Sequence, residues 1–171
     1  MHKYYSFSLT KSELKEFLDA KVLEYNNPKF IESDPIQIPH LFTLKEDIEI
    51  SAFLTATIAW GNRKSIINNA KRMMQLLDNY PYDFVSNHSE TDLEQLKPFV
   101  HRTFNGDDLI QFIKCLKNIY LKHIGLEAVF NKHADKDSLQ KSISKFKSIF
   151  FEIEHIARAQ KHISDPLKNS A

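Results

Sequence analysis

The chain has 171 residues, of which 42% are apolar and 26% are charged, and its formal net charge at pH 7 is +1. This length suits one domain, or a domain with an extension, and allows a core of ordinary size. A net charge near zero indicates no particular partner, and the single cysteine, Cys115, excludes an intrachain disulfide framework.

Charge is unevenly distributed along the chain. Residues 1–50 contain six Lys and nine acidic residues, residues 51–100 contain five of each sign, and residues 101–171 contain twelve Lys or Arg and eight acidic residues. The basic C-terminal part is compatible with an anionic partner, but an excess of this size also occurs on ordinary solvated surfaces.

The sequence has no recognisable targeting or membrane-spanning segment. No apolar run reaches the ~20 residues that span a bilayer. The N-terminal stretch MHKYYSFSLTKSELK has neither an apolar signal core nor a small-residue cleavage site. Together with the single cysteine, which suits a reducing compartment, this predicts a cytoplasmic protein with no membrane partner.

Apolar residues recur at helical spacing and glycine is rare, so the sequence predicts an all-α fold. We expect one domain over residues 1–171, with about six to eight helices in an orthogonal arrangement. Thr10–Glu13 has the pattern of a capping box, which begins a helix that should end near Asn26–Pro28. The apolar face of this helix would consist of Leu14, Phe17, Leu18 and Val22. The three prolines of residues 28–44 predict an ordered loop.

Two further helices, residues 45–60 and 65–79, are predicted to meet at a tight turn formed by Gly61 and Asn62. Ser65 is expected to cap the second helix. The residues expected to be buried in this pair are Phe53, Ala56, Ile66 and Met73 or Met74. Trp60, the only tryptophan, is more typical of a helix-packing residue than of a platform for stacked bases.

The rest of the chain predicts mostly helices. In order, we expect turns over 80–88, a helix that starts at a Ser89 cap and runs to 97, the most apolar helix over 106–124, a short segment over 127–133 and a long helix over 138–159.

The C-terminal stretch Ser164–Asp165–Pro166 has the pattern of a helix start. Because few residues follow it, we expect the domain to be incomplete at its C-terminus. Apolar surface on the helix over 107–124 would then be uncovered, with Phe112, Cys115, Ile119 and Leu121 as candidates. The chain should either form a homo-oligomer through this surface or cover it with its own residues 149–156.

The sequence lacks the usual catalytic and metal-binding patterns. There is no phosphate-binding glycine loop and no cysteine pair, and a di-iron site would need a second pair like Glu152–His155. We therefore expect no catalytic residue, no metal and no cofactor. For the histidines in loop-like contexts, hydrogen bonding to the backbone is the default expectation; these are His40, His88 and His101.

The glycine turn is the best candidate for a binding site. It brings the N-terminus of a helix and several cations to one place, which is chemistry suited to a phosphate. The candidate nucleic-acid-binding residues are Gly61, Asn62, Arg63, Lys64, Lys71 and Arg72. The alternative is a helical hairpin that needs glycine for its turn and has a basic surface by chance.

Several tracts resemble an uncharacterised bacterial family known as domain of unknown function 2400. They are DPIQIPHLF (34–42), DIEISAFLTATIAWGNRKSIINNAKRMM (47–74), PYDFV (81–85), FVHRTFNGDDLIQFIKCLKNIY (99–120) and HISDPLKNSA (162–171). The family looks like a distant relative of the helix-hairpin-helix DNA glycosylases, the endonuclease III superfamily, and this chain resembles the N-terminal part of such a protein.

The glycosylase resemblance implies DNA binding in a DNA-repair-like protein. It places Gly61 near the position of a residue that wedges into the DNA stack, a role that glycine cannot fill and that would pass to Asn62 or Arg63. The terminal SDPLKNSA falls where the hairpin would begin but lacks its Gly-x-Gly turn, and the catalytic lysine and aspartate of such enzymes lie after that hairpin. Whether the protein is an enzyme is therefore left open.

Two functions remain at this stage. The first is weak, non-specific binding of duplex DNA without the catalytic part of a glycosylase. The alternative is a helical protein–protein interaction module that binds no nucleic acid.

Overall fold

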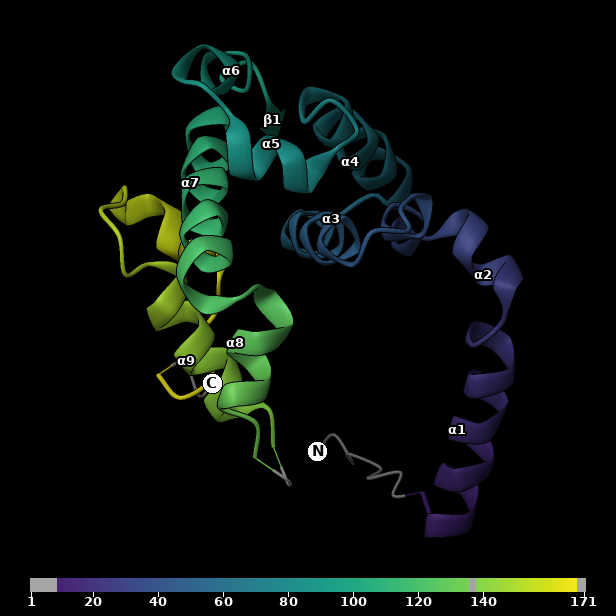
Figure 1. The fold of residues 1–171 in the computed structure, drawn as a ribbon. Coiled ribbons are helices and arrows are strands. Elements are labelled where there is room, and N and C mark those ends of the chain that lie inside the picture. Colours follow the sequence, from purple (N-terminus) through teal and green to yellow (C-terminus); the bar gives the residue numbers. More distant parts are fainter. Residues whose placement is uncertain (1–8, 136–137, 169–171) are drawn as a thin grey trace, which may run out of the picture. The chain divides into compact units, whose positions relative to one another are not determined.

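The computed structural model describes residues 9–135 and 138–168, and most of them are helical (Figure 1). This confirms the predicted all-α class. The chain divides into two compact units, with the boundary between Asp34 and Pro35.

The first unit contains helix α1 (Lys11–Tyr25) and helix α2 (Pro28–Ser33). The predicted capping box of α1 is confirmed, because Thr10 Oγ1 accepts the Glu13 N–H at 3.3 Å and the Glu13 carboxylate accepts the Thr10 N–H at 2.8 Å. No residue of α1 is buried, and the predicted apolar face is exposed.

The prediction of a loop from Pro28 onward was wrong for α2. Asn27 caps this helix by accepting the Phe30 N–H at 3.3 Å, and Pro28 occupies the first turn, where its missing N–H costs nothing. Proline therefore marks a helix start here.

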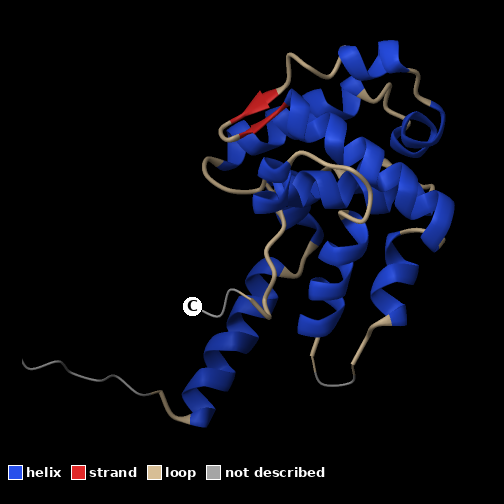
Figure 2. Ribbon diagram, turned by 90° about the vertical axis from the view of Figure 1, so that its left-hand side faces the viewer, coloured by secondary structure: helices blue, strands red, loops and turns tan. Residues whose placement is uncertain are grey.

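The second unit contains short 3₁₀ segments, seven α-helices and a two-stranded ribbon among its described residues. In chain order these are η1 (Pro35–Gln37), η2 (Pro39–Leu41), α3 (Lys45–Thr57), α4 (Arg63–Leu76), α5 (Pro81–Asn87), α6 (Glu90–Glu94), β1 (Val100–His101), β2 (Phe104–Asn105), α7 (Gly106–His123), α8 (Leu126–Lys132), α9 (Gln140–Phe150) and η3 (Ala157–His162). The antiparallel ribbon, red in Figure 2, pairs His101 with Phe104.

Helices α3 and α4 confirm the two predicted helices and the break between them. Of the residues expected to be buried, Ile66, Met73 and Met74 are buried, Phe53 is half-buried and Ala56 is exposed. The apolar side chains buried by α3 and its C-cap are instead Ile50, Leu54 and Ile58. These branched side chains recur every four residues and bury more apolar surface than alanine can.

Segment 81–87 is a helix, which contradicts the predicted turns. Pro81 again occupies the first turn, and Phe84 and Val85 are buried. His88 follows the helix, and its Nδ1 lies 3.0 Å from the Phe84 carbonyl oxygen, which confirms the expected backbone contact.

Phe112, near the middle of α7, is at the centre of an aromatic core. Its ring lies 5.3 Å from the Phe104 ring and 5.0 Å from the Phe150 ring, both in edge-on contacts. Phe112, Cys115 and Ile119 are fully buried, so the prediction that they are uncovered was wrong. Phe150 and Phe151 of the predicted segment 149–156 contact Phe112, as the second option expected. Leu121 alone of the four is exposed, at 73%.

Helix α9 ends at Phe150 rather than near residue 159. The side chain of Gln111 donates to the Glu154 carbonyl at 3.2 Å and accepts the Ile156 N–H at 3.2 Å. One amide thus satisfies two backbone groups of the following segment, which holds that segment outside a helix.

Candidate nucleic-acid interface

The turn between α3 and α4 is built around Asn62. Its Oδ1 accepts the Ser65 N–H at 3.1 Å, so Asn62 is the N-cap of α4. The prediction that Ser65 is the cap was wrong by three residues, and the helix begins at Arg63 instead of Ser65. Asparagine is as good a cap as serine, and the earlier position leaves Arg63 and Lys64 in the first turn.

Gly61 is required by conformation and by space. Its φ is +109°, a value that residues with a Cβ rarely adopt, and a Cβ at this position would lie 2.5 Å from Arg102 Nη1. Glycine thus allows the guanidinium to approach the turn.

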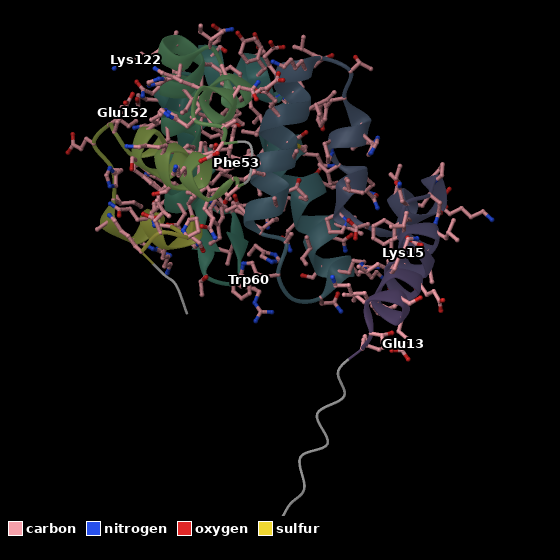
Figure 3. The ribbon with its side chains drawn as sticks, turned by 90° about the horizontal axis from the view of Figure 1, so that it is seen from below. Glu13, Lys15, Phe53, Trp60, Lys122 and Glu152 are labelled. Atoms are coloured by element: carbon pink, nitrogen blue, oxygen red, sulfur yellow. The ribbon has the colours of Figure 1, made fainter. Side chains whose placement is uncertain are left out.

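Arg102 packs on Trp60. The guanidinium carbon lies 4.2 Å from the centre of the indole ring, in a cation–π contact, and His101 meets the same ring edge-on at 6.4 Å. Trp60 is 40% exposed and lies at the edge of the protein in Figure 3, whereas the helix-packing role predicted a buried residue. Sequence analysis missed Arg102, although it lies in the tract HRTFNG.

His101 lies in strand β1 rather than in a loop, and it is buried. Burial lowers its pKa, because a charged imidazole is poorly solvated there. A hydrogen bond with the Trp60 backbone acts in the opposite direction.

All six predicted binding residues are exposed, and they lie along the turn and α4. Lys64 and Lys71 are seven residues apart, so they project within about 20° of each other on the helix, roughly 10 Å apart along its axis. Arg72 donates to the Pro98 carbonyl at 3.3 Å, which joins α4 to the segment before β1. Arg63 projects about 100° away from Lys64.

Two tracts without acidic residues meet at this surface. Residues 50–77 contain four Lys or Arg and no Asp or Glu, and residues 95–106 contain Lys97 and Arg102 and again no acid. The contacts of Arg72 with Pro98 and of Arg102 with Trp60 join them. Lys97 pairs with Glu94. We call the other five cations of the two tracts the basic surface: Arg63, Lys64, Lys71, Arg72 and Arg102.

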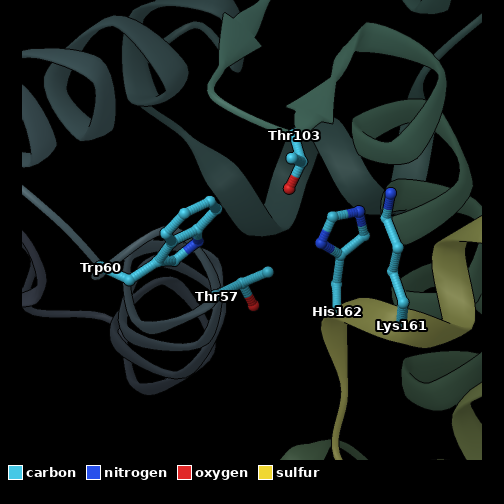
Figure 4. Close-up of a pocket in the computed structure, with 5 residues that line it drawn as sticks. All are labelled: Thr57, Trp60, Thr103, Lys161 and His162. Carbon is cyan, nitrogen blue, oxygen red and sulfur yellow. The ribbon is translucent and has the colours of Figure 1, made fainter.

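A pocket of about 380 Å³ lies beside Trp60 (Figure 4). Its lining residues come from the end of α3, the turn that follows α3, the ribbon turn and η3: Thr57, Trp60, Thr103, Lys161 and His162. Lys161 and His162 are about a hundred residues from Trp60 in sequence, so no local pattern could have joined them.

A buried charge cluster lies behind His162. Asp108 is fully buried, and its Oδ2 accepts the Asn105 N–H at 3.0 Å and pairs with Arg158 Nη2 at 3.0 Å. Nε2 of His162 lies 3.2 Å from the same oxygen, although the two are not aligned for a hydrogen bond. Burial lowers the pKa of His162, and the Asp108 carboxylate acts in the opposite direction.

Glu152 and His155 point to different partners. Glu152 accepts from Asn118 at 2.6 Å and contacts His123 Nε2 at 2.8 Å, and the His123 contact lowers the pKa of the Glu152 carboxyl group. His155 Nδ1 lies 2.7 Å from the Ile153 carbonyl oxygen. In Figure 3, Glu152 lies on the same side of the protein as Lys122. These contacts give the two side chains separate structural roles.

At the C-terminal end of the described residues, Pro166–Lys168 form a turn. Asp165, rather than Ser164, accepts the Leu167 N–H through its side chain at 3.1 Å. Contacts of this kind stabilise simple turns, and over the described residues this stretch is a turn rather than a helix.

The model of a family described as a protein of unknown function (DUF2400) matches residues 34–171. The chain belongs to this family. The match begins at the boundary between the two units and contains the whole basic surface and the pocket. Comparison with curated proteins and with solved structures gave no match.

Among the residues that the structure describes, no helix has the length and apolar character needed to cross a membrane.

Proposed function

We propose that this member of the family binds nucleic acid by its phosphate backbone, through the basic surface. The observation that carries the proposal is the meeting of two acid-free tracts that hold the five cations of this surface. Where surface charges of both signs alternate, their potentials largely cancel, whereas cations without interspersed acids attract a polyanion.

The chemistry of the turn supports the same proposal. The first turn of α4 presents backbone N–H groups next to Arg63 and Lys64, which suits a phosphate oxygen. Arg102 is held in a fixed position by the Trp60 ring, so little side-chain entropy is lost when it binds. Because binding would depend on a few cations that contact phosphates, it should be weak and sequence-independent.

A finer proposal follows from the resemblance to helix-hairpin-helix glycosylases. In that case the partner is duplex DNA, and Asn62 and Arg63 lie nearest to the bases. Gly61 would not act as a wedge, because its role is to admit Arg102. The Oδ1 of Asn62 already accepts a backbone N–H, which leaves its amide nitrogen for a base.

The salt dependence of duplex DNA binding tests the proposal. The double variant Arg63→Ala/Lys64→Ala should flatten the slope of log affinity against log salt by about one unit per lost contact. Lys122→Ala/Lys132→Ala removes the same charge from two exposed lysines at the ends of α7 and α8, and it should leave the slope unchanged. The proposal is wrong if the wild type does not bind at low salt, or if both double variants behave alike.

Helix α1 favours a second function, a protein–protein interaction module. It has no buried residue, and Leu14, Phe17, Leu18 and Val22 are all exposed on it. A 15-residue helix is marginal in water by itself and gains stability when an apolar face is covered. Sedimentation at micromolar concentration tests this function, because Phe17→Ser/Val22→Ser should abolish any self-association of the wild type, including a homo-oligomer. A monomeric wild type would leave a foreign protein as the partner of this helix.

A further inference from the structure

We propose that the pocket beside Trp60 binds a small phosphate ester whose ring carries hydroxyl groups, such as a sugar phosphate. This site is distinct from the basic surface, because Thr57, Thr103, Lys161 and His162 lie outside it. Its volume of about 380 Å³ is within the lower range of small-molecule sites.

His162 provides a hydrogen-bond acceptor that faces the pocket. Its side chain is only 5% exposed, and Nε2 lies beside the Asp108 carboxylate. The carboxylate favours the tautomer with its proton on Nε2, which leaves the lone pair on Nδ1. Figure 4 shows one ring nitrogen turned toward Thr57 and Trp60. Because Nε2 faces Asp108, that nitrogen is Nδ1, and it suits a ligand group that donates.

The charged groups around His162 keep this arrangement at neutral pH. Asp108 faces it from α7, and Arg158 and Lys161 face it from η3. Burial opposes a charge on the imidazole, so its neutral form, with one free lone pair, is favoured.

Thr57 lines the pocket with its methyl group (Figure 4). Its hydroxyl points away from Thr103 and His162 and donates to the Phe53 carbonyl at 2.9 Å. The methyl group adds apolar surface for a ligand ring, and Nδ1 of His162 is the acceptor for a hydroxyl group on that ring.

Lys161 provides the charge for the phosphate. Arg158 is engaged with Asp108 and donates to the Thr103 carbonyl at 2.9 Å, whereas Lys161 pairs with no carboxylate of the described residues. The cation therefore remains available to an anionic group, and Trp60 provides an apolar wall for the ring. Together these groups match a hydroxylated ring that carries a phosphate.

The single tryptophan makes this site directly observable. Titration of the protein with ribose 5-phosphate should change the fluorescence of Trp60 saturably, with calorimetry as a second measurement. Adenosine 5′-monophosphate is the second probe and separates a nucleotide from a sugar phosphate as the preferred ester. Inorganic phosphate and ribose should each bind at least about tenfold more weakly, because each lacks one half of the recognised chemistry.

Variants separate the two halves of the site. Lys161→Gln removes the cation and should weaken binding of the phosphate ester by about tenfold or more, while Lys168→Gln, a neighbouring exposed lysine, should not. His162→Gln places an amide near Asp108 but removes the acceptor at the Nδ1 position, and it should weaken the ester as well. If His162→Gln does not fold, because it replaces a buried side chain, Lys161→Gln alone tests the proposal.

The proposal is overturned if neither ester binds at millimolar concentration, if inorganic phosphate binds as tightly as the esters, or if Lys161→Gln binds like the wild type. It does not depend on nucleic-acid binding. Arg63→Ala/Lys64→Ala should retain the ester, and Lys161→Gln should retain any affinity for duplex DNA.

Discussion

Arg102 lies over the indole ring of Trp60, 4.2 Å from its centre, at the point where the chain reverses between α3 and α4. The contact joins the glycine turn to the β1–β2 ribbon, in which Arg102 itself has a positive φ of 56°. Both backbones are thus held in uncommon conformations around one contact. Trp60 thus contacts one cation of the basic surface and also lines the pocket.

Replacement of Gly61 by alanine should destabilise the protein. The φ of +109° is strained for any residue with a Cβ, and the added methyl group would meet Arg102. We expect a loss of about 1–3 kcal/mol in the free energy of unfolding, measured with urea. Adding Arg102→Ala should recover the part of the loss that is due to the clash, and the backbone part should remain. An unchanged stability would refute this account of the turn.

Gln111 should hold the segment that follows α9 in its non-helical conformation. Gln111→Ala leaves the Glu154 carbonyl and the Ile156 N–H without their partner, at a cost of about 1–3 kcal/mol in stability. Hydrogen exchange at the Ile156 amide should accelerate in the folded protein. The exposed Gln95→Ala provides the matched control. If exchange at Ile156 is unaffected, something else holds this segment.

Stability should decrease as the pH falls below neutrality. Burial lowers the pKa of His162 and of His101 in the folded protein, whereas in the unfolded chain both should titrate near the ordinary value of about 6.5. Below that pH the unfolded state binds protons that the folded state does not, so the free energy of unfolding falls. His162→Gln should reduce the loss between about pH 7 and about pH 5.

Local signals in the sequence predicted much of the helical framework. Examples are the capping boxes at Thr10 and Ser89 and the helix that starts at Gly106. They depend on contacts between residues three or four positions apart, which can be recognised from the sequence. The glycine turn at Gly61 is of the same kind. A proline such as Pro81 can occur in a loop or in the first turn of a helix. Here the segment is a helix because Phe84 and Val85 are buried in the core, and the sequence alone did not predict that burial.

The pocket could not be predicted in this way. Trp60 and His162 are about a hundred residues apart, and they meet because α7 and η3 are joined by Asp108, Arg158 and His162. Similarly, the segment after α9 leaves its helical path because of Gln111, some forty residues earlier. Long-range side-chain contacts of this kind have no periodicity by which they could be recognised.

The two cations at the middle of α4 should differ in their effects. Lys71 shares a helix face with Lys64 and has no ion pair among the described residues, so Lys71→Ala should flatten the salt dependence of DNA binding as much as Lys64→Ala does, by about one unit. Arg72 is held by the Pro98 carbonyl, and its loss should also cost about 0.5–1.5 kcal/mol of stability. Arg72→Lys should restore much of the salt dependence but not the stability, because an ammonium group on a flexible chain does not reproduce the guanidinium contact. Equal effects of the Lys71 and Arg72 substitutions on both measurements would show that α4 does not present its cations to DNA as a single face.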